Sequence, residues 1–111
     1  MITTRQASDN QEKQIAKLLN GKVQSNSGGC KFGGGDVHTK QFFIEAKTTL
    51  KEKTSFSIKK EWIAKAKEQA FEQNKPYHSL AFQFEPDGEN YFIINEKLMQ
   101  QLIELTEVDD V

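Results

Sequence analysis

The segment 41–48, QFFIEAKT, constrains the fold more than any other, because an apolar strand there carries a charged pair. In a β-strand, residues two apart share a face. The even-numbered side chains, which include Phe42 and Ile44, are therefore expected to face the core. Glu45 and Lys47 share the opposite face, where a strand fixed by its apolar side would hold both charged groups rigidly.

A second acid comes shortly before this strand. Residues 36–39 read as the first strand of a hairpin that turns near Lys40, so Asp36 can lie across from Glu45 or close to it. That arrangement would gather two carboxylates and the ammonium group of Lys47 in one cluster. The alternative is that Glu45 and Lys47 form a surface cross-strand pair and that Asp36 ends a turn.

Two carboxylates a few ångströms apart repel each other, and a divalent cation between them removes that cost. Magnesium is the expected ion, with manganese as a substitute, because Mg²⁺ binds one or two carboxylates together with waters and phosphate oxygens. Asp36 and Glu45 would be its ligands. The metal would activate a water for attack on a phosphodiester, and Lys47 would hold that water or stabilise charge on the phosphate.

The rest of the chain predicts further helices and strands around this segment. Apolar residues recur at helical spacing in 9–20, 57–74 and 96–105, with stops at Gly21 and Pro76. Strands are expected at 22–25, 36–39, 41–48, 77–85 and 90–95. The order α-β-β-β-α-β-β-α predicts an α/β (α+β) fold with one mixed central β-sheet flanked by helices.

Length and composition predict a single domain. With 111 residues, we expect the domain at 9–105, between a flexible N-terminus at 1–8 and an acidic flexible tail at 106–111. The single Cys30 can form no internal disulfide, and no apolar stretch reaches the roughly 20 residues that span a bilayer. These features predict a cytoplasmic protein with no membrane partner.

The charges are unevenly distributed although the net charge is only −1. Between Lys47 and Lys75 there are eight Lys and four Glu, an excess that suits either a phosphate-binding surface or an ordinary solvated helix face. The glycine-rich stretch 27–35 would let backbone amides approach a phosphate closely. The residues expected to contact DNA in these segments are Gly28, Lys31, Lys51, Lys53, Lys59 and Lys60.

Asp36, followed by Glu45-Ala46-Lys47 at the end of an apolar strand, is similar to the motif of the PD-(D/E)xK nuclease superfamily. In that superfamily two acids and a lysine form a metal-dependent cleavage site. The order of elements over residues 9–105 resembles that of the archaeal-type Holliday-junction resolvases and related phage resolvases. The resemblance implies a restriction-endonuclease-like domain that cuts branched DNA, such as a four-way junction, in DNA recombination or repair.

The same resemblance implies three further site residues. Glu12 would be an additional catalytic acid near the metal, Ser27 would lie beside the scissile phosphate, and Gln69 would face the site from the second helix. The chain departs from the family pattern at Gly35, which stands where the motif has proline before the first acid. It also lacks the strongly basic balance of junction-binding proteins.

Two classes of function follow from these features. The first is a Mg²⁺-dependent endonuclease that acts as a symmetric homodimer, since a two-fold junction needs two cuts. The second is a non-catalytic DNA- or protein-binding module that retains the nuclease fold. Among the remaining residues, we expect His38 to be a solvated hairpin residue, and Trp62, Phe56 and Phe71 to be core residues rather than platforms for base stacking.

Overall fold

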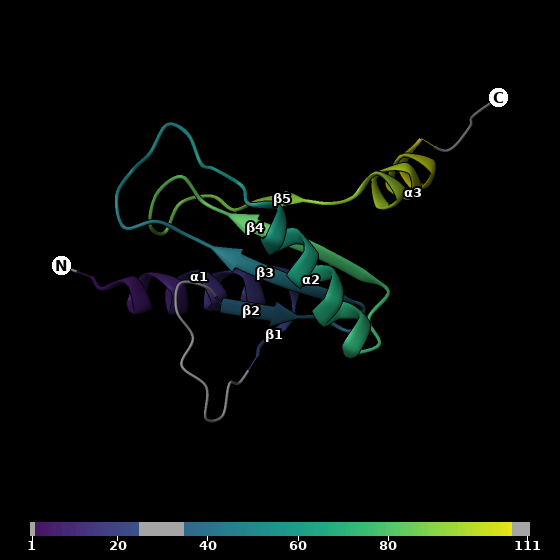
Figure 1. Cartoon of the computed structure of the whole chain (residues 1–111), viewed down its shortest axis with the longest axis horizontal. Helices are drawn as coiled ribbons and strands as arrows, with labels where there is room; N and C mark the ends of the chain where they lie inside the picture. The colour runs from purple at the N-terminus through teal and green to yellow at the C-terminus, as the bar shows by residue number, and fades with distance from the viewer. Residues whose placement is uncertain (1, 25–34, 108–111) are drawn as a thin grey trace.

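The computed structural model of the chain describes residues 2–24 and 35–107, which form a mixed sheet and its helices (Figure 1). In chain order the elements are α1 (Thr4–Leu19), β1 (Lys22–Val23), β2 (Gly35–His38), β3 (Phe42–Lys47), α2 (Lys60–Glu72), β4 (Tyr77–Phe82), β5 (Tyr91–Ile93) and α3 (Glu96–Thr106). The predicted element order and the mixed α/β class are confirmed. Most of the glycine-rich stretch and the end of the acidic tail lie outside the described residues.

The sheet has its strands in the order β1-β2-β3-β4-β5. Neighbouring strands are antiparallel except β3 and β4, which are parallel. A parallel pair needs a crossover connection rather than a hairpin, and α2 supplies it between these two strands. Strand β3 therefore lies in the middle of the sheet, with a hairpin partner on one side and a crossover partner on the other.

The helices α1 and α2 cover opposite faces of the sheet, with α2 in front and α1 behind in Figure 1. On the side that we call the α1 face, Ile15 packs on a cluster that includes Ile44. On the α2 face, Phe43 packs against Ala66 of the helix. Residues two apart share a face, so the odd-numbered side chains of β3 lie on the α2 face and the even-numbered ones on the α1 face.

Helix α1 begins earlier than the sequence pattern predicted, at Thr4 rather than near residue 9. Its cap is Thr3, whose hydroxyl accepts a hydrogen bond from the Gln6 backbone N–H while the Gln6 side chain accepts one from the Thr3 N–H. This reciprocal capping box satisfies backbone donors that the first turn leaves open. Residues 4–8 of the predicted N-terminal segment are therefore helical.

The end of α1 also differs from the prediction. Asn20, rather than Gly21, adopts the left-handed backbone conformation that stops the helix, with a φ of 56°. Gly21 instead permits a close approach, because a Cβ atom at that position would lie 2.7 Å from the carbonyl oxygen of His38. The chain can thus turn from α1 into the edge strand β1 against β2.

Helix α3 lies apart from the sheet at the end of an extended segment (Figure 1). Asn95 caps it by accepting a hydrogen bond from the Leu98 N–H, and none of its residues is buried. Most of its apolar side chains, which include Met99 and Leu102, are exposed. Over the described part of the chain, the helices are too short or too polar to cross a membrane.

Candidate active site

The two acids of the motif lie directly opposite each other in the β2–β3 hairpin. Asp36 is the register partner of Glu45, as the hairpin pattern predicted. Both side chains point to the α2 face, and both are buried, with exposed fractions of 5% for Asp36 and 1% for Glu45. The alternative that Glu45 belongs to a surface pair is therefore wrong, because the sheet and α2 enclose its carboxylate.

Two lysines approach the buried carboxylate of Glu45 from different elements. The Nζ atom of Lys47, on the same strand, lies 3.4 Å from Glu45 Oε2. The Nζ atom of Lys65, on α2, lies 3.9 Å from the same oxygen. Lys65 was not predicted as a site residue. It stands three residues after Trp62 on α2, a spacing that brings two side chains to the same side of a helix.

Burial dominates the electrostatics of this site. Desolvation raises the pKa of Glu45 from 4.5 to about 7, assisted by the hydrogen bond that its protonated form makes with Asp36 and by the charge of Asp36. Lys65 and Lys47 lower that pKa in part. The second oxygen of Glu45, Oε1, is buried and has no hydrogen-bond partner among the described residues. The Glu45 carboxylate is therefore poised to take up either a proton or a further cation.

The donor set fits a hard divalent cation. Asp36 and Glu45 offer carboxylate oxygens from adjacent strands, and a cation between them would relieve the repulsion that raises the pKa of Glu45. Within residues 2–24 and 35–107, no group of three His, Cys, Asp or Glu side chains is placed to hold a metal ion. A metal at this pair would take its other ligands from water, backbone carbonyls or substrate, as Mg²⁺ commonly does.

The ammonium group of Lys47 lies between the acid and an aromatic ring. Its Nζ atom is 4.7 Å from the centroid of the Trp62 ring, and the Lys47 side chain is only 14% exposed. A cation held both by a carboxylate and by a ring face has little freedom to reorient. Strand β3 and helix α2 together therefore fix the position of this charge.

A groove of about 720 Å³ adjoins this position, lined by Thr48, the segment 52–57, Lys59 and Trp62. We call it the lysine-aromatic groove. Within it, Lys59 Nζ lies 5.7 Å from the Trp62 ring centroid, and Lys53 Nζ lies 6.0 Å from that of Phe56. Both rings are partly exposed rather than buried, so the expectation that they are core residues is only half met.

The other predicted site residues are distributed over both faces. Glu12 is buried on α1, the helix that covers the opposite face from Glu45, so its role as an additional acid stays a prediction. Gln69 lies one helical turn after Lys65 and is partly buried, on the same side of α2. Lys60, the first residue of α2, is exposed.

Three predicted DNA contacts, Ser27, Gly28 and Lys31, lie outside the described residues, as does Cys30. Lys51 is exposed, but it lines a hollow beside the first turns of α1 rather than the lysine-aromatic groove. Lys53 borders both hollows. The structure thus separates Lys51 from the lysines that surround the aromatic rings.

A buried network of amides on the α1 side was not predicted. Gln11 donates hydrogen bonds to the Lys47 carbonyl at 2.8 Å and to Asn90 at 3.1 Å. Gln83 donates to Gln14 and to the Gly88 carbonyl, both at 2.9 Å. These bonds tie the end of β3, where Lys47 is located, to α1 and to the β4–β5 connection. Except for the bond from Gln83 to Gly88, these bonds join residues far apart in sequence, which a local pattern does not reveal.

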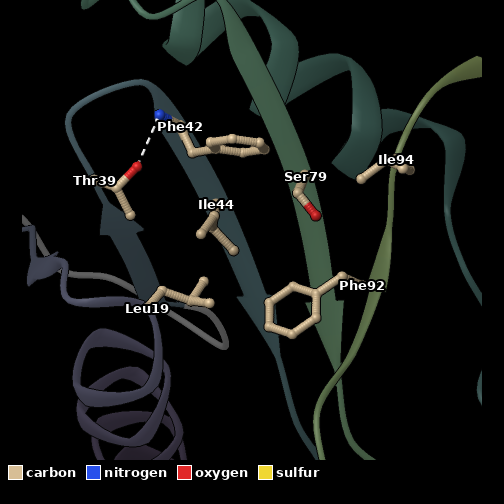
Figure 2. A pocket seen from close by; sticks show the side chains of 7 residues that line it. All are labelled: Leu19, Thr39, Phe42, Ile44, Ser79, Phe92 and Ile94. Carbon is tan, nitrogen blue, oxygen red and sulfur yellow. Dashed lines mark hydrogen bonds between the residues drawn. The ribbon is translucent and has the colours of Figure 1, made fainter. Parts of the chain in front are cut away.

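A separate apolar cavity of about 350 Å³ lies on the α1 face (Figure 2). Figure 2 shows Leu19 from α1, Ile44 from β3 and Phe92 from β5 around it, beside a hydrogen bond in which the Phe42 N–H donates to the Thr39 hydroxyl at 3.0 Å. The cavity is separated from the carboxylates by the sheet. It is therefore a surface feature distinct from the charged site.

No protein-family model, no curated protein and no solved structure matches the chain. The residues of the site and their motif are therefore the basis on which a function can be proposed.

Proposed function

We propose that the chain is a metal-dependent endodeoxyribonuclease that hydrolyses phosphodiesters in branched DNA, in the manner of the Holliday-junction resolvases that its motif resembles. One observation carries the proposal: Asp36 and Glu45 are buried opposite each other, and an ammonium group lies 3.4 Å from Glu45. Adjacent buried carboxylates destabilise a fold unless cations compensate them. Such a pair is expected where a metal ion and a phosphate are to be bound.

The residues of the proposed site have different roles. Asp36 and Glu45 hold Mg²⁺, or Mn²⁺ in its place. When bound, the ion acts as a Lewis acid and lowers the pKa of a bound water. Lys47, whose position Glu45 and Trp62 fix, donates to a non-bridging phosphate oxygen as negative charge develops on it. Lys65 favours the ionised form of Glu45 by adding a second positive charge near Oε2.

The proposed enzyme works as a homodimer in the cytoplasm of a bacterial or phage-infected cell, where its DNA substrate would be. A four-way junction has two-fold symmetry and needs two cuts, whereas the described residues of this chain offer one such carboxylate pair. The exposed apolar side of α3 and the cavity beside Leu19 and Phe92 are surfaces that a second copy would cover. Light scattering should then give a mass near twice 12.7 kDa.

A second candidate function is a DNA-binding module without catalysis. The lysine-aromatic groove favours it, because rings and ammonium groups bind nucleic acid without any metal. The two candidates differ in whether the carboxylate pair is needed.

The experiment uses the full chain with labelled immobile junction, flap, linear duplex and single strand. We expect cleavage of branched DNA in Mg²⁺ or Mn²⁺ and none in EDTA. Glu45→Gln should abolish it, while the matched control Glu68→Gln, at an exposed position on α2, should cut normally. Binding of these DNAs with no cleavage under any metal would support the module instead. Equal cutting by Glu45→Gln would overturn the proposed site.

A further inference from the structure

We infer that the lysine-aromatic groove binds an unpaired nucleotide, with the base stacked on Trp62 and the phosphate between Lys53 and Lys59. Resting on the proposed function, this inference identifies the substrate as DNA that has a single-stranded segment beside the cut. It concerns a binding site on the opposite side of Lys47 from the carboxylate pair.

The rings of the groove form a supported platform. Phe56 lies 6.5 Å from Trp62, with an interplanar angle of 57°, and 5.4 Å from Phe82 behind it. Phe82 is in turn packed against Tyr91 at 5.8 Å. Trp62 and Phe56 thus keep a partly exposed surface while other rings fix them from behind. A ring fixed in this way can accept a base with little loss of conformational entropy.

The charges around the platform favour a phosphate. Lys53 and Lys59 are exposed, and each holds its ammonium group over one of the two rings, at 6.0 Å and 5.7 Å. Glu52 is the one acid among the residues that line the groove. A combination of aromatic platforms with basic side chains is how proteins bind single-stranded nucleic acid. The groove volume of about 720 Å³ is within the range of small-ligand sites.

A base that stacks on Trp62 has to be unpaired. A base in a duplex has both faces covered by its neighbours, so it cannot stack on Trp62 unless it leaves the helix. An unpaired base at a branch or flap has an available face. Lys47 contacts both the Trp62 ring, at 4.7 Å, and Glu45, at 3.4 Å, so a strand that stacks on Trp62 passes directly beside the carboxylate pair.

The chain supplies its own reporter, because Trp62 is its single tryptophan. The test uses full-length Glu45→Gln protein in EDTA, so that binding is measured without cleavage. We expect a labelled oligothymidine and a flap to quench the Trp62 fluorescence and to bind, by anisotropy, about 10-fold more tightly than a linear duplex of equal length. Equal affinity for duplex, or no quenching by any strand, would overturn the inference.

Variants locate the binding surface. Trp62→Ala should weaken single-strand binding by about 10-fold or more, whereas Trp62→Phe, which keeps a ring and the packing, should retain most of it. Phe71→Ala is the matched control, since Phe71 is the exposed aromatic residue near the other end of α2. Circular dichroism will show that each variant is folded. If Trp62→Phe also binds as weakly as Trp62→Ala although folded, the stacking argument fails.

The phosphate contacts have a separate readout. Replacing Lys53 and Lys59 together by Ala should flatten the slope of log affinity against log salt by about one to two units, because each lost phosphate contact removes about 0.7 of a unit for a single strand. Lys97→Ala, on α3, should leave the slope unchanged. An unchanged slope in the double variant would overturn the phosphate assignment. If DNA quenches Trp62 fluorescence but the wild-type chain does not cleave it, the nucleotide site is supported and the nuclease is refuted. If the chain cleaves DNA with no dependence on Trp62, the nuclease is supported and the nucleotide site is refuted.

Discussion

Both faces of the sheet bury polar side chains, but the two faces differ in how well these side chains are hydrogen-bonded. On the α1 face, Gln83 is 1% exposed, and its amide makes three hydrogen bonds, to Gln14, Gly88 and Thr48. On the α2 face, Glu45 is also 1% exposed, yet its Oε1 has no hydrogen-bond partner among the described residues. The two side chains are therefore equally buried, but within the described part of the chain only Gln83 has a hydrogen-bond partner for each of its polar atoms.

This difference distinguishes side chains that stabilise the fold from side chains whose burial destabilises it. A neutral amide that makes all its hydrogen bonds is compatible with a core and fixes the geometry of its neighbours. A carboxylate beside a second carboxylate is compatible with a core only if it is protonated or if cations compensate it. The buried polar side chains of the α1 face thus stabilise the fold, whereas those of the α2 face lie where we propose that chemistry takes place.

The largest expected effect is on cleavage. Asp36→Asn, Glu45→Gln and Lys47→Ala should each lower the rate of phosphodiester cleavage by at least about 100-fold, a typical loss for one electrostatic group of an active site. Asp36→Asn and Glu45→Gln should remain folded, because each removes one of two charges that repel each other. Circular dichroism checks that Lys47→Ala is folded as well. Single-turnover cleavage of a labelled branched DNA in Mg²⁺ measures the rate. Wild-type nicking by any of the three would remove that residue from the catalytic set.

Substitutions of buried amides on the α1 face should lower the stability of the fold. Gln83→Ala should lower the free energy of unfolding by about 3 kcal/mol, because it leaves the partly buried partners of the amide unsatisfied and opens a small cavity. Urea denaturation followed by circular dichroism measures the change. Gln100→Ala, at an exposed position on α3, is the matched control and should have no effect. If Gln83→Ala costs nothing, the amide network does not stabilise the fold.

The dependence of stability on pH should distinguish the faces as well. The folded-state pKa of Glu45 is about 7, above its ordinary value of 4.5, so the folded chain binds this proton more tightly than the unfolded chain. This contribution is complete below about pH 4.5 and is lost as the pH rises through about 7. Between pH 8 and pH 5, without metal, the wild-type chain should gain about 2 to 3 kcal/mol relative to Glu45→Gln. Parallel pH profiles for the two proteins would contradict the raised pKa.

The smallest expected effect belongs to Lys65, the cation that the sequence analysis missed. Lys65→Ala removes a positive charge 3.9 Å from Glu45 and should raise the pKa of that acid further. The pH profile of cleavage should therefore shift to higher pH, with a loss of only several-fold near pH 7, since Lys65 is itself half exposed and screened by solvent. Lys67→Ala is the matched control on the exposed side of α2. An unshifted profile would show that Lys65 does not tune Glu45.

Local patterns predicted the centre of the molecule well. The alternation along β3 and the short connection to β2 were enough to pair Asp36 with Glu45, because a hairpin register depends on neighbours in sequence. The order of elements followed from periodicity and turn residues. By contrast, the contact of Lys65 with Glu45 depends on how α2 packs across the sheet, and no local period encodes that.

Tertiary packing also decides the features that were predicted wrongly or not at all. Phe71 was expected in the core, but it lies off the helical line of Trp62, Ala66 and Ala70 and is 82% exposed. The bond from Gln11 to the Lys47 carbonyl joins α1 to the end of β3, segments whose proximity only the assembled sheet creates. The sequence could suggest which residues carry the chemistry, but not which residues position them.

The placement of the acids in a hairpin bears on how the chain folds. A hairpin closes within microseconds through local contacts, whereas the crossover that brings β4 beside β3 closes a longer loop and is slower. We therefore expect Asp36 and Glu45 to meet first in water, where their repulsion is small, and to lose that water only when α2 docks. Docking of α2 is the step at which the two like charges oppose collapse, so acidification or a divalent cation should accelerate it.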